Sequence, residues 1–218
     1  MLEWRYALLM AVHLQSSLFD QEAEVGTRPL SGLRRTDLGH GAWIDVLPQW
    51  LRGADTLFET LVRDVAWRAE QRVMYERVVA VPRLLAFFGR HDPLPHPALE
   101  AARTELGEHY AAELGEPFTT AGLCFYRDGR DGVAWHGDTI GRGSSEDTMV
   151  AILSLGAPRH LALRPRRPGP APVRRPLGHG DLIVMGGSCQ RTWEHAIPKT
   201  ARAVGPRVSV QFRPAGVR

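Results

Sequence analysis

The spacing of apolar and polar positions changes near residue 118. Before this point, apolar side chains recur at helical spacing in two stretches. The first is 56–72, where Asp55 is a candidate N-cap, and the second is opened by Pro97 and ended by Gly115. The pattern therefore predicts two amphipathic helices in the first half of the chain.

Beyond residue 118 the pattern is that of short strands separated by turn residues. The predicted strands are 121–127, 149–156, 159–164, 173–177, 181–186 and 207–213. Strands that follow helices predict an α+β fold, mainly β, in which a double-stranded β sandwich or a jelly roll (double-stranded β-helix) has helices packed on one side. We expect one domain over 1–218, with an N-terminal extension, helices and lid in 1–117 and the jelly-roll core in 118–214.

Other segments of the first half have weaker patterns. Residues 1–36 contain several breakers and predict a loose arm, while 39–50 predicts a strand or turn that runs into a short helix. The β-branched and aromatic stretch 78–90 predicts a strand, and Pro82 indicates an edge strand or a bulge. The proline-rich segment 91–97 predicts a loop.

The composition is that of an ordinary globular protein, with 44% hydrophobic and 23% charged residues in 218. No apolar run approaches the ~20 residues of a membrane helix. The N-terminus does not resemble a signal peptide, and Met10 is an alternative start to Met1. The two cysteines, Cys124 and Cys189, are far apart and suit a reducing compartment. We expect a cytoplasmic monomer with no membrane partner.

The net charge of +3 favours a polyanionic partner only weakly. Lys199 is the only lysine, so the arginine content can reflect GC-rich coding. The segment 159–175 is more informative, because it holds six arginines and no acidic residue. It predicts a basic lip for nucleic acid, and a solvated loop is an equally good interpretation.

The stretch 123–138, LCFYRDGRDGVAWHGD, contains the first candidate chemistry. His136 and Asp138 are two residues apart, so an extended segment projects both from one side. With one more histidine they would make the 2-His-1-carboxylate face that binds non-haem Fe(II). A second His-Gly-Asp occurs at His179 and Asp181, and a turn histidine beside a capping Asp is the rival interpretation of each motif. Spacing alone does not decide between them.

The segment 207–213, RVSVQFR, alternates apolar residues with a polar face that carries Arg207 and Arg213. It is either an amphipathic edge strand or the lining of a polar cavity in which an arginine binds a carboxylate. At ~3.3 Å per residue the two arginine Cα atoms are about 20 Å apart, so both cannot bind the same end of a small diacid.

Four ordered stretches resemble the AlkB-type iron(II)/2-oxoglutarate dioxygenases: FYRDGRDGVAWHGD, ILSLGAPRHLAL, GHGDLIVMGGSCQRTWEHAIPKT and PRVSVQFR. The resemblance covers about 120–214 and, more faintly, VPRLLAFFG at 81–89. It implies a jelly roll with an N-terminal nucleotide-recognition lid, and Fe(II), 2-oxoglutarate and O2 as cofactor and cosubstrates. It also implies demethylation of N-alkylated bases in DNA or RNA, with release of formaldehyde, succinate and CO2.

The resemblance also implies roles for individual residues. The iron ligands would be His136, Asp138 and His195. The 2-oxoglutarate contacts would be Arg207, Tyr126 and Arg213, with Cys124 and Ser209 where the family often has Asn. The second pair, His179 and Asp181, would lie in a turn and bind no metal.

Substrate contacts are less defined. Trp135, Phe88 and Trp193 are candidates for stacking on a flipped base, although Phe88 and Trp193 equally suit a core. Candidates for phosphate contacts are Arg83, Arg164, Arg166, Arg167, Arg174 and Arg175. Thr139 or Ile140 stands where several family members have an acidic residue that favours cationic bases.

Two alternatives to nucleic-acid dealkylation remain open. One is the same chemistry on a protein side chain, lipid or small molecule. The other is a non-catalytic jelly roll that binds nucleic acid through the basic lip. Replacing His136 or Asp138 with Ala separates the catalytic interpretations from the last one.

Overall fold

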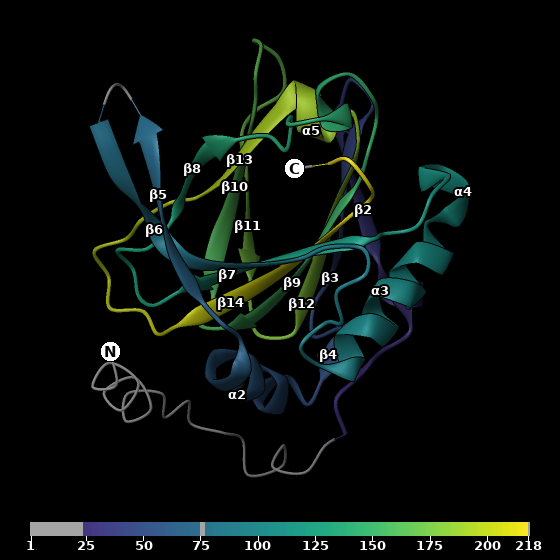
Figure 1. Ribbon diagram of the computed structural model, residues 1–218. Coiled ribbons are helices and arrows are strands. Elements are labelled where there is room, and N and C mark those ends of the chain that lie inside the picture. Colours follow the sequence, from purple (N-terminus) through teal and green to yellow (C-terminus); the bar gives the residue numbers. More distant parts are fainter. Residues whose placement is uncertain (1–23, 75–76, 218) are drawn as a thin grey trace.

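The computed structural model describes residues 24–74 and 77–217, and in it most strands belong to two antiparallel sheets. The larger sheet has eight strands in the order β2-β3-β12-β9-β14-β7-β6-β5. Their bounds are Arg34–Gly39, Ala42–Leu47, Asp181–Gly187, Val150–Gly156, Arg207–Arg213, Thr120–Tyr126, Arg77–Phe88 and Arg68–Met74. The jelly-roll expectation, a mainly β fold with few helices, is confirmed (Figure 1).

The smaller sheet has four strands in the order β11-β10-β13-β8. Their bounds are Val173–Leu177, Arg159–Pro165, Trp193–Ile197 and Val133–His136. A short third pair joins β1 (Gly26–Thr27) to β4 (Leu51–Arg52). The sequence pattern did not predict β8 or β13, and these two strands carry the two candidate histidine ligands, while Asp138 lies two residues beyond the end of β8.

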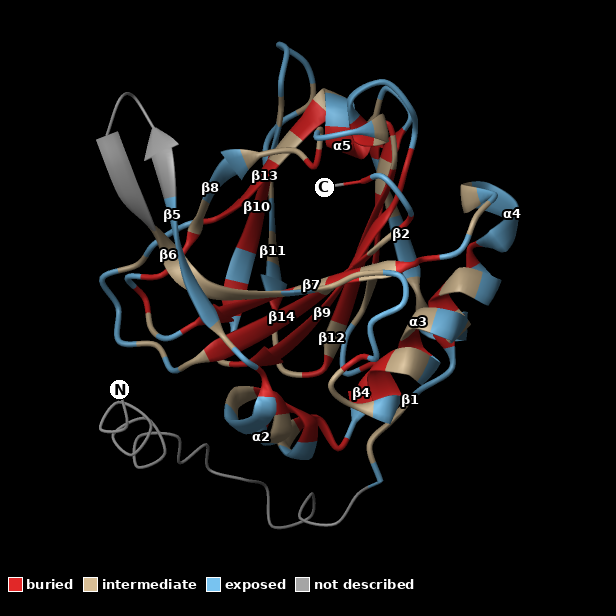
Figure 2. Ribbon diagram, in the orientation of Figure 1, coloured by how far each residue is buried: buried red, intermediate tan, exposed pale blue. Residues whose placement is uncertain are grey.

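Alternation along the central strands produces two cores. Val208, Val210 and Phe212 of β14 pack into a core on the helix side of the larger sheet. On β9, Ala151 points into that core and the next residue, Ile152, points into the other. The second core lies between the two sheets, whose facing strands are largely buried (Figure 2).

Two main helices cover the outer face of the larger sheet. Helix α2 (Ala54–Asp64) contacts β9 and β14, and α3 (Pro97–His109) begins where His96 Nδ1 accepts a hydrogen bond of 3.1 Å from the Ala98 amide. The shorter α4 (Ala111–Leu114) ends at Gly115, whose φ of 72° is left-handed, as expected for a terminating glycine. The remaining short elements are 3₁₀ turns Leu30–Gly32 and Arg142–Ser144 and helix α5 (Cys189–Thr192).

The helix predicted over 56–72 is wrong beyond residue 64. It ends at Asp64, Gly53 rather than Asp55 is its N-cap, and Arg68–Met74 forms β5 instead. Pairing with β6 outweighs the helical preference of this segment, because propensity is weaker than tertiary pairing. The fold therefore gains a long hairpin, β5–β6, which projects from one end of the larger sheet (Figure 1).

Two further predictions need correction, and a third is decided between its two alternatives. The loose arm expected over 1–36 is wrong from residue 26, where β1 begins, and its first 23 residues lie outside the described part. The segment 39–50 forms β3 but no helix near Trp50. Of the two alternatives for Pro82, the edge strand is wrong, since β6 pairs with both β5 and β7. The bulge is borne out, because the register shifts opposite Pro82, between Ala69 and Gln71. Within the described residues, no helix has the length and apolar character to cross a membrane.

Candidate metal centre and anion pocket

Two short strands of the smaller sheet bring the candidate histidines together. Strand β8 pairs antiparallel with β13, and in this register His136 lies directly opposite His195. Their ring centroids are 4.2 Å apart. With Asp138 they are the only described group of three or more such donors whose ligand atoms all lie within 4.8 Å of one another. Thus the structure brings together the three predicted metal ligands.

Hydrogen bonds from two different elements hold Asp138 in place. Its Oδ2 accepts a hydrogen bond of 2.6 Å from Nε of Arg213, on the larger sheet. Its backbone amide donates to Oε1 of Gln190 at 3.0 Å, and Gln190 belongs to α5. Burial alone would raise the pKa of this carboxyl, but Arg213 and the two imidazoles lower it to about 2. The side chain is therefore a carboxylate near neutral pH.

Hydrogen bonding and burial prepare the two imidazoles as ligands. Nδ1 of His136 lies 2.9 Å from the Ala134 carbonyl oxygen, to which it can donate, and its Nε2 lies 3.7 Å from Asp138 Oδ1. Burial, with the neighbouring His136, lowers the pKa of His195 to about 3. Two imidazole nitrogens and one carboxylate are a donor set that fits divalent iron and would leave coordination positions open.

The polar face of β14 continues from this centre into the space between the sheets. Arg207, at the other end of the strand from Arg213, is 1% exposed. Its Nε donates to Ser154 Oγ at 3.0 Å, while Nη1 has no hydrogen-bond partner among the described residues. Burial lowers the pKa of Arg207 below its ordinary value, but a guanidinium stays protonated. A buried guanidinium with an unused donor fits a carboxylate ligand.

The neighbouring strand β7 extends this polar face, and the surface made by Tyr126, Cys124, Arg207 and Ser209 is called the floor. In the β14–β7 register, Tyr126 lies opposite Arg207 and Cys124 lies opposite Ser209. The guanidinium of Arg207 is 5.1 Å from the Tyr126 ring centroid. All five residues predicted to contact 2-oxoglutarate therefore lie on one face of two adjacent strands. Gln211 lies between Ser209 and Arg213 on the same face and was not predicted as a site residue, although strand alternation could have indicated it.

The predicted substrate residues are more scattered. Trp135 is 38% exposed beside His136, and Arg164 lies over its ring at 4.3 Å. Phe88 is half-buried against the helix-side core, and Arg83 donates to the Gly132 carbonyl at 3.3 Å. Only Trp135 of these three presents an exposed ring beside the candidate metal ligands.

The basic lip is smaller than the arginine count indicated. Arg159 is 5% exposed and donates to backbone carbonyls, including that of Pro198 at 2.7 Å. Arg164 and Arg166 both pair with Glu194, at 2.7 Å and 3.4 Å, next to His195 in sequence. The exposed arginines of the lip without an ion pair in the described structure are Arg167 and Arg174.

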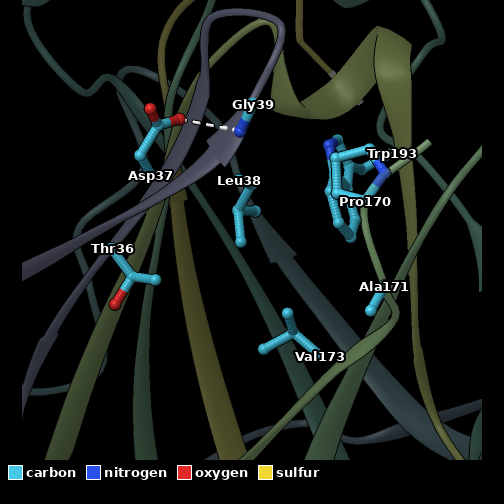
Figure 3. A pocket seen from close by; sticks show the side chains of 8 residues that line it. All are labelled: Thr36, Asp37, Leu38, Gly39, Pro170, Ala171, Val173 and Trp193. Atoms are coloured by element: carbon cyan, nitrogen blue, oxygen red, sulfur yellow. Dashed lines mark hydrogen bonds between the residues drawn. The ribbon is translucent and has the colours of Figure 1, made fainter.

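A separate cavity opens elsewhere on the molecule. It has a volume of about 320 Å³ and lies between β2 and residues 170–173, with Trp193 in its wall (Figure 3). Trp193 is 1% exposed, and its indole nitrogen has no described partner. None of the three candidate metal ligands lines this cavity. Trp193 is therefore a buried core residue, as one of its two interpretations held.

The second His-Gly-Asp has no third ligand among the described residues. His179 Nδ1 accepts from the Gly156 amide at 2.7 Å, and its Nε2 lies 3.1 Å from Asp55. Asp181 accepts from the backbone amides of Gln49 and Gly178 at 2.8 and 2.6 Å. These contacts stabilise turns, which agrees with the structural role expected for His179 and Asp181.

Comparison with known proteins identifies a matching family model and several related proteins. Residues 46–213 match the model of the 2OG-Fe(II) oxygenase superfamily. The alpha-ketoglutarate-dependent dioxygenase alkB homolog 3 of Homo sapiens is 30% identical over 213 residues, covering 87% of this chain and 69% of that protein. Its Bos taurus counterpart is 31% identical over 186 residues, covering 75% of this chain. The DNA oxidative demethylase ALKBH2 of Homo sapiens is 29% identical over 182 residues, covering 73% of this chain and 68% of that protein. The match to the bovine protein spans 62% of its length, less than two thirds.

Proposed function

Because the chain belongs to the 2OG-Fe(II) oxygenase superfamily and is of the AlkB type, we propose that it is a dioxygenase that oxidatively demethylates N-alkylated bases in DNA or RNA. The observation that carries this proposal is the convergence of two imidazoles and a carboxylate within 4.8 Å, beside a buried guanidinium with an unused donor. Formaldehyde, succinate and CO2 would be the products.

His136, Asp138 and His195 would hold the iron. The hydrogen bonds from Arg213 to Asp138 and from His136 to the Ala134 carbonyl fix two of these ligands before any metal arrives. Outer contacts of this kind orient ligands and raise metal affinity. When bound, iron with 2-oxoglutarate and O2 supplies the oxidising power that converts an N-methyl group into a hydroxymethyl group, which is lost as formaldehyde.

Arg207 would bind the carboxylate of 2-oxoglutarate remote from the metal. The guanidinium is buried and held by Ser154, so a charge-assisted contact there is strong and excludes water. Burial raises the pKa of Tyr126 to about 12, so its hydroxyl stays neutral and can donate to the same carboxylate. Ser209 and Cys124 would line the middle of the cosubstrate, where the family's amides are missing.

Nucleic acid would approach the open side of the smaller sheet. Trp135 offers one ring face for stacking, because Arg164 covers the other and is itself held by two hydrogen bonds to Glu194, at 2.9 and 2.7 Å. Arg166 and Arg167 would contact phosphates, and Arg83, Phe88 and the β5–β6 hairpin would form the lid. The substrate class rests on the relatives, two of which are named as alkB homologues and one as a DNA demethylase.

We further propose that residues 1–218 form one domain that acts as a cytoplasmic monomer. Two observations support a reducing location: Cys124 and Cys189 are both buried, and both are free thiols.

The test uses purified protein with Fe(II), 2-oxoglutarate and oligonucleotides that contain 1-methyladenine or 3-methylcytosine. Formaldehyde and succinate should appear in equal amounts, and His136→Ala should abolish both. His160→Ala, which changes an exposed histidine of the same sheet, is the matched control and should keep full turnover. Active succinate release without dealkylation of either base would contradict the substrate class.

A second candidate keeps the chemistry and changes the substrate to a protein side chain, lipid or small molecule. The observation that favours it is the absence of an acid just after Asp138, where Thr139 is followed by Ile140, which is 69% exposed. This surface would not attract a cationic base. The candidate predicts succinate release without measurable affinity for oligonucleotides of any modification.

A further inference from the structure

Gln211 connects the cosubstrate floor to the metal side of the site. It lies on β14 between Ser209 and Arg213, and strand alternation turns all three toward the space between the sheets. No chemical role follows for it from the metal-ligand motif or from the arginine pair. Its contacts nevertheless involve both ends of its carboxamide.

The amide nitrogen of Gln211 binds the two short side chains of the floor. It donates to Ser209 Oγ at 2.8 Å and lies 3.4 Å from Cys124 Sγ, within reach of a weak hydrogen bond. The amide oxygen accepts from Nη2 of Arg213 at 3.1 Å. An arginine only donates, so this contact fixes which end of the amide faces which partner.

Arg213 links Gln211 to the candidate metal ligand Asp138. Its Nε donates to Asp138 Oδ2 at 2.6 Å, so one guanidinium binds both the Gln211 carbonyl and the candidate ligand. The strand alongside leaves room for this arrangement. A Cβ on Gly122 would lie 2.9 Å from Arg213 Nη1 and 3.5 Å from Gln211 Oε1.

We propose that Gln211 is a positioning residue that orients Arg213 toward Asp138 and ties this orientation to the floor on which 2-oxoglutarate lies. The inference rests on the proposed function and deepens it. The Gln211 carboxamide contacts Ser209 and Cys124 through its nitrogen and Arg213 through its oxygen, so it links them. An amide that the family often carries at 124 and 209 is therefore supplied from position 211.

The decisive variant is Gln211→Met, which keeps the length of the side chain and removes both hydrogen-bonding atoms. If Gln211 orients Arg213, the affinity for Mn(II), measured by titration calorimetry on metal-free protein, should fall about tenfold. The KM for 2-oxoglutarate should rise by a similar factor, with a smaller change in kcat. If Gln211 only fills space, Met should leave both affinities within twofold of wild type, and this result would overturn the proposal.

A second variant separates the two ends of the amide. Gln211→Glu keeps an acceptor for Arg213 but places a negative charge beside the dianionic cosubstrate. The KM for 2-oxoglutarate should therefore rise more than tenfold, while Mn(II) affinity should fall less than in Gln211→Met. Equal losses of both affinities in the two variants would contradict the assignment.

The control is Val210→Ala on the same strand. Val210 points into the helix-side core, so its loss should lower the melting temperature without changing either affinity at temperatures where the protein is folded. Failure of the proposed function has a different signature, because wild-type protein would then bind no Mn(II), release no succinate, or release succinate without dealkylating either base. If the wild type does both and Gln211→Met does too, only the role of Gln211 is refuted.

Discussion

The tripeptide His-Gly-Asp occurs twice in this protein, and the two copies have different surroundings. The copy at 136–138 follows a strand of the smaller sheet and meets His195 and Arg213. The copy at 179–181 joins β11 to β12 and binds the backbone amides of three other residues. The same three residues therefore provide a candidate metal centre in one place and a turn clamp in the other.

The central glycines differ as well. Position 137 requires glycine because space is lacking: a Cβ there would lie 2.3 Å from the carbonyl oxygen of Gln190. Position 180 favours glycine because of its backbone conformation: φ is +79°, in the left-handed region. The comparison teaches that the tripeptide has no metal chemistry of its own. Whether a copy can bind a metal depends on whether the fold places a third ligand beside it and a cation against its carboxylate.

The largest expected contrast is between the two aspartates. Asp138→Asn removes the charged ligand, so Mn(II) affinity and formaldehyde release should each fall by more than about 100-fold, beyond what changes of outer contacts cost. Asp181→Asn should keep both at the wild-type level and lower only the melting temperature. Calorimetric titration and a turnover assay on both variants measure this. Equal metal affinity in the two would break the comparison.

The next contrast exchanges the glycines. Gly137→Ala should push Gln190 and Asp138 apart and lower Mn(II) affinity by about 10- to 100-fold, as for lost outer contacts. Gly180→Ala should cost ~1–2 kcal/mol of folding free energy for a left-handed residue, with metal affinity unchanged. Denaturant unfolding followed by metal titration separates the two effects, and a normal metal site in Gly137→Ala would count against the steric argument.

A smaller effect is expected for the histidine of the second copy. His179→Ala leaves the Gly156 amide without its acceptor and removes the 3.1 Å contact with Asp55, so the free energy of unfolding should fall by ~1–3 kcal/mol. Metal affinity should not change. Urea unfolding gives the first quantity, and any weakening of Mn(II) binding would mean that the two copies are linked.

The smallest effect is the pH dependence of stability that comes from Tyr126, a residue of the floor beside the first copy. Burial raises the pKa of Tyr126 from its ordinary value of about 10 to about 12. The folded protein therefore keeps this proton longer than the unfolded chain does. The resulting stability is fully present below pH 10 and is lost as the pH rises toward 12, by up to ~1.4 kcal/mol per pH unit. Tyr126→Phe should lack this loss, and unfolding free energies of both proteins between pH 8 and 11 test it.

Much of the fold follows from patterns in the sequence. Alternation predicted the central strands close to their observed bounds, and Pro97 and Gly115 predicted the limits of the second helical segment. Strands β8 and β13 were missed because each is short, and the register between them shifts after His195. A short strand without alternation has no local signal, and it becomes a strand only because a partner strand satisfies its backbone groups.

The sequence by itself determined which residue types are present and which faces of β14 and β9 are polar or apolar, because alternation along a strand is a local property. Only the tertiary structure decided which His-Gly-Asp meets a second imidazole, and that Arg213 reaches Asp138 across 75 residues of chain. It also decided that Gln211 joins Arg213 to the floor. The physical reason is that each of these contacts depends on strand register between segments far apart in sequence, and register is fixed by burial of two cores at once.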